Sequence, residues 1–116
     1  MECVFCKIAQ GTLPADVVFE NTEVKAFRDI HPKAPVHVLV IPKVHVASVA
    51  VLTPEHDTVI AALLHAAKDI AAARGLAGYK LLFNVGREGG QMVDHLHLHI
   101  LGGWKEQKPT IKNLNV

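Results

Sequence analysis

The chain contains the stretch Asp94-His-Leu-His-Leu-His-Ile-Leu-Gly-Gly103, in which histidine alternates with aliphatic residues. Successive side chains of a strand point to opposite faces, so a strand here predicts His95, His97 and His99 on one face and the aliphatic residues on the other. Such a strand rises about 13 Å from His95 to His99, which is too far for one metal ion to bind all three imidazoles. We therefore expect the histidine row to serve more than one purpose.

The residues alone leave three interpretations of this row open. The histidines could be ordinary solvated strand residues. A His-x-His pair could instead chelate a catalytic metal, as in a metal hydrolase centred on His37, His97 and His99. In the third interpretation an imidazole acts as a nucleophile while its neighbours handle protons and phosphate charge.

Length and composition predict one globular domain. The chain has 116 residues, of which 50% are hydrophobic and 20% are charged, as is typical of a folded rather than a disordered chain. The formal net charge is +1, without a block of like charge, which argues against binding to a nucleic acid polymer. A single nucleotide is a more plausible ligand.

The N-terminal residues lack the charged and apolar regions of a signal peptide, and no segment reaches the roughly 18 apolar residues of a membrane span. These features predict a cytoplasmic protein that does not associate with membranes. In a reducing compartment, Cys3 and Cys6 are better explained as a metal-binding or redox pair than as a structural disulfide.

Hydrophobic periodicity and turn signals predict two helices and about five strands. The clearest element is a long helix with Thr53 as N-cap, Pro54 at the first helical position and Gly75 at its end. A short helix is expected over residues 3–10. The β-rich runs cover residues 17–20, 24–28, 36–41 and 79–84, followed by the histidine stretch. Since helices and strands do not alternate regularly, this order predicts an α+β domain with a mainly antiparallel sheet.

Two of these elements carry predictions about which residues face the core. Apolar residues of the long helix recur at three- and four-residue steps, which predicts one stripe against the sheet. In strand 36–41, alternation groups His37 with Leu39 and Ile41, so a polar ring faces an apolar surface. That ring is either a satisfied core histidine or part of a site. The predicted helical stripe consists of Val59, Ile60, Leu63, Leu64, Ala67, Ile70 and Ala71.

The run His95-Leu-His-Leu-His-Ile-Leu101 resembles the histidine-triad motif, His-φ-His-φ-His-φ-φ with φ apolar. Residues 29–43 and 84–91 resemble the nucleotide-binding segments of the same family in order and spacing. The likeness runs from about Cys3 to Trp104 and indicates the nucleotide-binding branch, whose members are small dimeric nucleoside phosphoramidate hydrolases. It implies a single domain of the histidine-triad (HIT) fold over residues 1–104, with one long and one short helix, and a C-terminal tail over residues 105–116.

The resemblance implies a covalent mechanism without a catalytic metal. His97 would attack the α-phosphorus of a purine nucleoside 5′-phosphoramidate, expel the amine and leave a nucleotidyl-histidine that water hydrolyses. The backbone carbonyl of His95 would fix the tautomer of His97. His99 would contact the phosphate or the leaving group, with His37 beside it.

The resemblance also implies the ligand contacts for a purine nucleotide such as AMP. Asp29 would accept hydrogen bonds from the ribose hydroxyls, and the amides of Asn84 and Gln91 match the ligand contacts of the family. The backbone N–H groups of the glycine loop that contains Gly90 could converge on phosphate oxygens. The apolar slot around the base would consist of Phe5, Ile8, Phe27, Ile30 and Leu39, although these residues are also expected core residues.

Met92 departs from the eukaryotic pattern, in which a serine often stands two residues after the paired glycines. The side chain of methionine cannot donate a hydrogen bond, so only the backbone N–H of Met92 could serve the leaving group. We expect activity with an altered leaving-group preference.

The Cys-x-x-Cys pair resembles that of bacterial-type relatives, which complete a structural zinc site with two histidines. The resemblance assigns the ligands Cys3, Cys6, His45 and His95, a donor set that suits tetrahedral zinc. This division explains the long histidine row, because His95 would bind metal while His97 and His99 face phosphate.

Two other functions remain open beside phosphoramidate hydrolysis. A dinucleoside polyphosphate hydrolase would use the same histidine on a longer phosphate chain. A zinc-stabilised module that binds nucleotides or a protein partner would have little turnover. Homodimerisation is a further expectation of the family, in which two sheets join.

Overall fold

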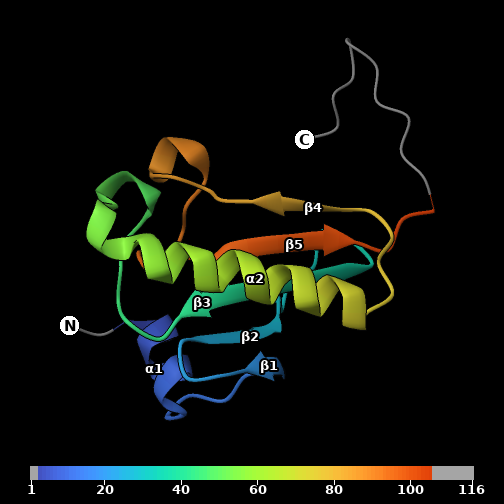
Figure 1. Ribbon diagram of the computed structural model, residues 1–116, viewed down its shortest axis with the longest axis horizontal. Helices are drawn as coiled ribbons and strands as arrows, with labels where there is room; N and C mark the ends of the chain where they lie inside the picture. The colour runs from blue at the N-terminus through green and yellow to red at the C-terminus, as the bar shows by residue number, and fades with distance from the viewer. Residues whose placement is uncertain (1–2, 106–116) are drawn as a thin grey trace.

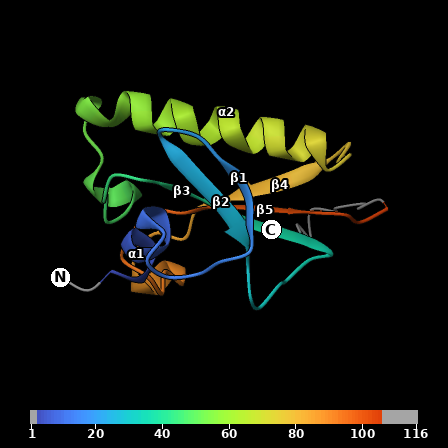
Figure 2. The same ribbon diagram turned by 90° about the horizontal axis from the view of Figure 1, so that it is seen from below.

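An antiparallel sheet lies between a long helix on one face and a short helix on the other (Figures 1 and 2). The computed structural model describes residues 3–105. Within that range the strand order is β1-β2-β3-β5-β4, and every neighbouring pair is antiparallel. The strands are β1 (Val17–Glu20), β2 (Val24–Arg28), β3 (Val36–Pro42), β4 (Tyr79–Leu82) and β5 (Leu98–Gly102). The predicted α+β class and antiparallel sheet are confirmed.

The central strand β3 is buried on both faces. Val38 and Val40 join the core beneath the long helix, whereas Leu39 and Ile41 join the cluster beneath the short helix. The alternation predicted from the sequence is therefore correct, and it turns His37 toward the short-helix side.

The long helix α2 (Asp57–Ala73) is entered through one 3-10 turn, Pro54–His56. Thr53 caps that turn as predicted, and the ring Nδ1 of His56 accepts the Thr53 N–H at 3.0 Å. The predicted stripe is wrong at one position, because Leu64 is 44% exposed while Ala66 is buried. Leu64 lies about 100° around the helix from Leu63, outside the face that meets the sheet.

The short helix α1 (Val4–Gln10) begins and ends where the sequence indicated. The Sγ of Cys3 accepts the N–H of Cys6 at the N-terminus. Gly11 ends the helix with a φ of 82°, which glycine adopts without a steric penalty. Phe5 and Ile8 are the buried residues of the helix.

The histidine stretch is only partly a strand, which corrects the prediction of one continuous strand. The β5 ladder begins at Leu98, because the preceding residues bond elsewhere: the N–H of Leu96 donates to the carbonyl of Val46. Leu96 nevertheless joins the α2 core together with Leu98 and Ile100. The predicted alternation of buried aliphatic residues therefore extends to Leu96, before the first residue of β5.

Of the predicted tail, residues 106–116 lie outside the described part of the chain. No helix among the described residues is long and apolar enough to cross a bilayer.

Candidate functional site

A cavity of about 890 Å³ opens on the sheet face that carries α1. Its walls come from α1, from the β2–β3 connection and from the ends of β4 and β5. Most of the residues predicted for catalysis or nucleotide binding line it. These are Phe5, Ile8, Phe27, Asp29, Ile30, His37, Leu39, Asn84, Gly90, Met92, His97 and His99.

The buried part of the predicted base slot consists of Phe5, Ile8, Phe27 and Leu39, which form one cluster. The rings of Phe5 and Phe27 pack edge to face, with 5.5 Å between the ring centroids. Ile30 belongs to the rim instead, because 86% of its surface is exposed. Of the five residues predicted for the base slot, four are thus buried and Ile30 lies at the opening of the cavity.

Met92 also lies at the rim and is 82% exposed. Its thioether can offer apolar contact but no hydrogen bond donor to a ligand in the cavity. On the same side, the cavity wall contains Lys80, Leu82, Leu101 and Trp104, none of which was predicted. The pairing of Leu82 with His99 across β4 and β5 explains their position, but that register cannot be read from the sequence.

His37 and His99 form a hydrogen-bonded pair whose tautomers follow from their neighbours. The Nδ1 of His37 accepts the backbone N–H of Lys33 at 3.0 Å, so its proton must lie on Nε2. That Nε2 lies 2.9 Å from Nδ1 of His99 and 3.3 Å from a carboxylate oxygen of Asp29. His99 therefore accepts through Nδ1 and carries its own proton on Nε2.

The Nε2 atom of His99 is buried and has no hydrogen bond partner among the described residues. A buried N–H without a partner is costly, which makes this atom a natural donor to a ligand oxygen. Burial, together with the nearby His97 and His37 rings, lowers the pKa of His99 to about 4. Burial also lowers the pKa of His37, although Asp29 opposes the shift. Both rings are thus neutral near pH 7.

His97 has the opposite arrangement of lone pair and proton. Its Nδ1 lies 2.7 Å from the backbone carbonyl oxygen of His95, which can only accept a hydrogen bond. The Nδ1 of His97 is therefore protonated, and Nε2 keeps a free lone pair. The Phe5 ring packs edge-on against the imidazole at 5.1 Å. A fixed, unprotonated imidazole nitrogen at the wall of a cavity can act as a nucleophile.

His95 is fully buried and does not line the cavity; its side chain turns to a second cluster. Its Nε2 donates to the carbonyl oxygen of Pro42 at 2.9 Å, which leaves the lone pair on Nδ1. That atom lies 3.4 Å from Sγ of Cys3, 3.5 Å from Sγ of Cys6 and 3.2 Å from Nδ1 of His45. All four predicted metal ligands are thus brought together, within 4.8 Å of one another.

These separations fit a tetrahedral zinc ion. Zinc bonds of about 2.3 Å to sulfur and about 2.0–2.1 Å to nitrogen require S···N distances of about 3.5 Å and N···N distances of about 3.3 Å in a tetrahedron. The S···N distances involving His95 are 3.4 and 3.5 Å, and the two imidazole nitrogens are 3.2 Å apart. Both cysteines are free thiols rather than a disulfide. Two sulfur and two nitrogen donors are a typical set for structural zinc.

Asp29, His37 and His99 also converge closely enough to be considered as metal ligands. The 2.9 Å between the two imidazole nitrogens is, however, a hydrogen bond distance and shorter than the about 3.3 Å that two zinc-bound nitrogens need. A proton lies between these rings in the arrangement derived above. The geometry favours a proton-bearing pair over a catalytic metal centre.

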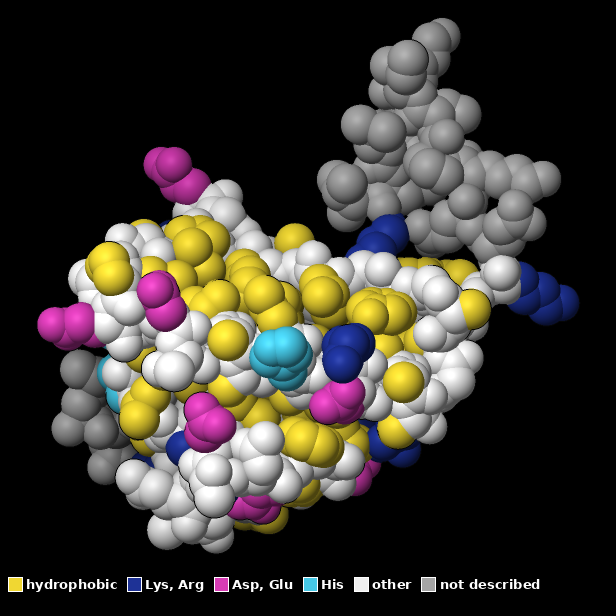
Figure 3. Space-filling view, in the orientation of Figure 1, with side chains coloured by type: hydrophobic (Ala, Val, Ile, Leu, Met, Phe, Trp, Pro, Cys, Tyr) yellow, Lys and Arg dark blue, Asp and Glu magenta, His cyan; other side chains and the backbone are white. Residues whose placement is uncertain are grey.

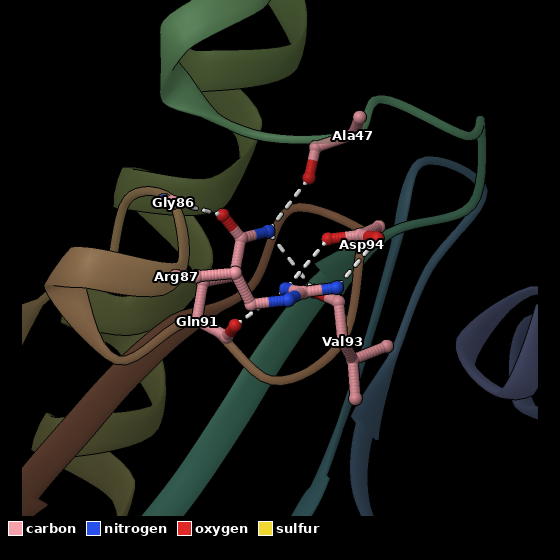
Figure 4. A network of polar contacts seen from close by, with 6 residues as sticks. All are labelled: Ala47, Gly86, Arg87, Gln91, Val93 and Asp94. Atoms are coloured by element: carbon pink, nitrogen blue, oxygen red, sulfur yellow. Dashed lines mark hydrogen bonds and ion pairs between the residues drawn. The ribbon is translucent and has the colours of Figure 1, made fainter.

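Gln91, predicted as a ligand contact, is not among the residues that line the cavity. The side chain is 2% exposed, and its amide is used inside the loop that precedes the histidines (Figure 4). The amide oxygen accepts the N–H of Gly86 at 3.0 Å, while the amide nitrogen donates to the carbonyls of Ala47 at 2.8 Å and Val93 at 2.9 Å. The Gln91 amide therefore holds the loop together, and its contact with a ligand stays a prediction.

Arg87 and Asp94 close the same loop with a bidentate ion pair that was not predicted from the sequence (Figure 4). Both guanidinium nitrogens lie 2.9 Å from the two carboxylate oxygens. Asn84 contributes from the other end, because its amide nitrogen donates to the carbonyl of Gly89 at 2.8 Å. The opposite charges at the two ends of the loop were the only signal in the sequence, and such pairs are common on surfaces.

Comparison with known proteins gives one family. A family model described as "Scavenger mRNA decapping enzyme C-term binding" matches residues 2–113. The purine nucleoside phosphoramidase of Escherichia coli strain K12 is 41% identical over 104 residues, which is 88% of this chain and 87% of that protein.

Solved structures of the same family superpose closely. A HIT family hydrolase from Legionella pneumophila has a TM-score of 0.89 and 50% identity, over 93% of this chain and 98% of that one. A zinc-bound histidine triad family protein from Mycobacterium smegmatis has a TM-score of 0.81 and 33% identity, over 96% of this chain and 81% of that one.

Proposed function

This chain belongs to the histidine triad (HIT) family, and we propose from that premise that it hydrolyses the P–N bond of purine nucleoside 5′-phosphoramidates to give an AMP-type nucleotide and an amine. One observation carries the proposal. His97, whose Nε2 keeps a free lone pair, and His99, whose Nε2–H has no partner among the described residues, both line one cavity, beside an apolar slot of the kind that holds a base.

The proposed reaction has two steps at the α-phosphorus. In the first step, Nε2 of His97 forms a bond to phosphorus, the P–N bond breaks, and the amine leaves with one added proton. The N–H of His99 stabilises the negative charge on a phosphate oxygen during this step. The carbonyl of His95 faces the Nδ1–H of His97 at 2.7 Å and stabilises the positive ring of the nucleotidyl-histidine.

In the second step, water attacks phosphorus, the bond to His97 breaks, and one proton is released. The proton taken up by the amine is thereby returned, so the cycle consumes only water. Asp29 would bind the ribose, and the slot of Phe5, Ile8 and Phe27 would bind the base. His37 holds His99 in the tautomer that donates.

The substrate class is tested by comparing kcat/KM for adenosine 5′-phosphoramidate with that for a diadenosine polyphosphate. We expect the phosphoramidate to be preferred at least about tenfold. A preference for the polyphosphate would support the alternative hydrolase of the same family. Nucleotide binding without turnover of either substrate would support the zinc-stabilised binding module.

We propose further that Cys3, Cys6, His45 and His95 hold a structural zinc ion. Its support is the tetrahedral spacing of the four ligand atoms and the zinc-bound relative from Mycobacterium smegmatis. When bound, zinc would supply a cross-link between α1 and the residues before β5, and no chemical step. The proposal includes a cytoplasmic location for the protein, because thiols stay reduced there and can bind the metal.

The proposed homodimer is supported by an apolar band between α2 and the edge strand β4 (Figure 3). Among residues 3–105, β4 pairs only with β5, and Leu81 on this strand is 42% exposed. Leu64 on α2 is 44% exposed, as noted above. Light scattering should give a dimer mass for the wild type and a monomer mass for Leu81→Lys. A monomeric wild type would contradict the proposal.

A further inference from the structure

Helix α1 is too short to fix its own position. Its seven residues make about two turns, and isolated helices of that length are unstable in water. It stands on the face of the sheet opposite α2 (Figure 2) and brings Phe5 and Ile8 to the wall of the cavity. The attachments at its two ends must therefore decide where that wall lies.

The N-terminal end of α1 is attached through the cysteines. Sγ of Cys3 and Sγ of Cys6 lie 3.4 and 3.5 Å from Nδ1 of His95. Phe5 stands between the two cysteines in the sequence, and its ring packs against His97 at 5.1 Å. This half of the helix is thus held against the proposed nucleophile.

The C-terminal end of α1 is attached through Lys25 of β2. Its Nζ donates to the carbonyl oxygen of Ile8 at 2.9 Å, and the residue is only 8% exposed. Val24 and Ala26 on either side join the α2 core, so alternation turns Lys25 toward α1. Its Nζ also lies 3.8 Å from a carboxylate oxygen of Glu20, the residue opposite it in the hairpin.

A lysine at this position needs an explanation. An ammonium group is costly to bury unless it is paired and hydrogen-bonded, and an aliphatic residue would suit this face of β2 equally well. Phe27, two residues along the same face, is such an apolar residue and lines the slot. Unlike an aliphatic residue, the lysine donates a hydrogen bond to the backbone carbonyl of Ile8 in α1.

We propose that Lys25 is a positioning residue for the nucleotide base. By holding the carbonyl of Ile8, it fixes the C-terminal half of α1 and the Ile8 side chain in the slot. The inference rests on the proposed nucleotide-binding function. Since Phe5 and His97 are held by the other half of the helix, loss of Lys25 weakens nucleotide binding and leaves the chemical step unchanged.

The test is Lys25→Met, which keeps the aliphatic stem and removes the ammonium. The Kd of AMP by calorimetry and the KM for adenosine 5′-phosphoramidate should both rise about tenfold, because a hydrogen bond from a charged donor is lost. The kcat should stay within about twofold of the wild type. Lys25→Arg keeps a charged donor and should restore most of the affinity.

Glu20→Gln is the matched control, because it removes the charge of the other partner and leaves the bond from Lys25 to Ile8. It should leave the Kd of AMP within about twofold of the wild type. If Lys25→Met does not fold, Lys25→Gln carries the same expectation, since its side chain is one atom shorter and still faces Glu20.

An unchanged Kd in a folded Lys25 variant would overturn the positioning role, as would an equal loss in Glu20→Gln. A fall in kcat without a rise in KM would also overturn it. A wild type that binds AMP without hydrolysing the phosphoramidate would contradict the proposed hydrolase activity. In that case the comparison of Kd values for AMP would still test the role of Lys25. A wild type that does neither would overturn both.

Discussion

The two histidine clusters of this molecule contain the same residue type but differ in whether an imidazole turns its lone pair or its N–H toward the cluster. In the cluster at α1, the backbone carbonyl of Pro42 accepts a hydrogen bond from the Nε2–H of His95, which leaves the lone pair on Nδ1 facing two thiols. In the cavity, a backbone N–H from Lys33 occupies the lone pair of His37 and leaves a proton facing His99. The hydrogen bond partner of one ring nitrogen thus determines the protonation of the other nitrogen of the same imidazole. If the partner is a carbonyl, the other nitrogen has a lone pair that suits a metal; if the partner is an N–H, the other nitrogen carries a proton that suits a hydrogen bond acceptor.

One residue joins the two clusters. His95 faces the thiols through its side chain and orients His97 through its backbone carbonyl. The two clusters can nevertheless be separated by experiment, because their side chains do not overlap. Variants on one side should change metal content and stability, and variants on the other side should change turnover.

The largest expected effect is loss of the metal in the double variant Cys3→Ser and Cys6→Ser. Zinc per chain should fall from about one to near zero. A ligand at 1,000 times its Kd stabilises a fold by about 4 kcal/mol, so the Tm should fall by about 10–20 °C. Metal analysis and thermal unfolding measure both.

The control for the cysteines is His65→Gln, which changes an exposed histidine on α2. It should keep the zinc and the Tm of the wild type. Equal zinc content in the cysteine variant and the wild type would contradict the metal assignment.

A second prediction acts on the cavity alone. His99→Ala removes the unpartnered N–H of a cavity residue, so kcat should fall about 10²–10³-fold, as is typical for one positioned donor. Zinc content should stay at the wild-type value, since His99 touches none of the four proposed ligands in the described structure. If kcat survived this change, His99 would be a structural residue only.

The smallest expected effect is on stability against pH. Burial lowers the pKa of His99 to about 4, whereas an unfolded histidine titrates near about 6.5. Between these values the unfolded chain binds more protons, so the free energy of unfolding falls as the pH falls from about 6.5 to about 4. Above that window this contribution is fully present and does not vary.

His99→Gln should make this slope shallower, as measured by urea unfolding at several pH values with constant zinc. His65→Gln, on the exposed surface, should keep the wild-type slope. Identical slopes for all three proteins would mean that burial does not hold His99 neutral.

Local patterns in the sequence predicted most of the fold correctly. The hairpin strands, the two-faced β3 and the cap at Thr53 each depend on neighbours within a few residues. Leu64 was wrongly predicted to be buried because periodicity gives the centre of the apolar face of a helix but not its borders. Which border residues are buried depends on how the helix packs on the sheet. The start of β5 was missed because Leu96 bonds to Val46, fifty residues away.

In the site, too, features that depend on local sequence patterns were predictable, and features that depend on distant residues were not. Alternation alone separated His95, His97 and His99 from the aliphatic residues, and the resemblance supplied their roles. The hydrogen bonds of the Gln91 amide inside the loop, to Ala47 among others, could not be predicted, because these partners cannot be read from the sequence. Lys25 gave no signal at all, since a lysine in a hairpin strand is usually exposed.

The central claim is that the cavity histidines do the chemistry and the metal cluster does not. The direct test is release of AMP from adenosine 5′-phosphoramidate by the wild type and by His97→Ala, with excess chelator in both assays and folding checked by circular dichroism. We predict turnover by the wild type and a loss of at least about 10⁴-fold in the variant. Comparable turnover by a folded His97→Ala, or wild-type turnover that falls with chelator while the fold is retained, would contradict the account.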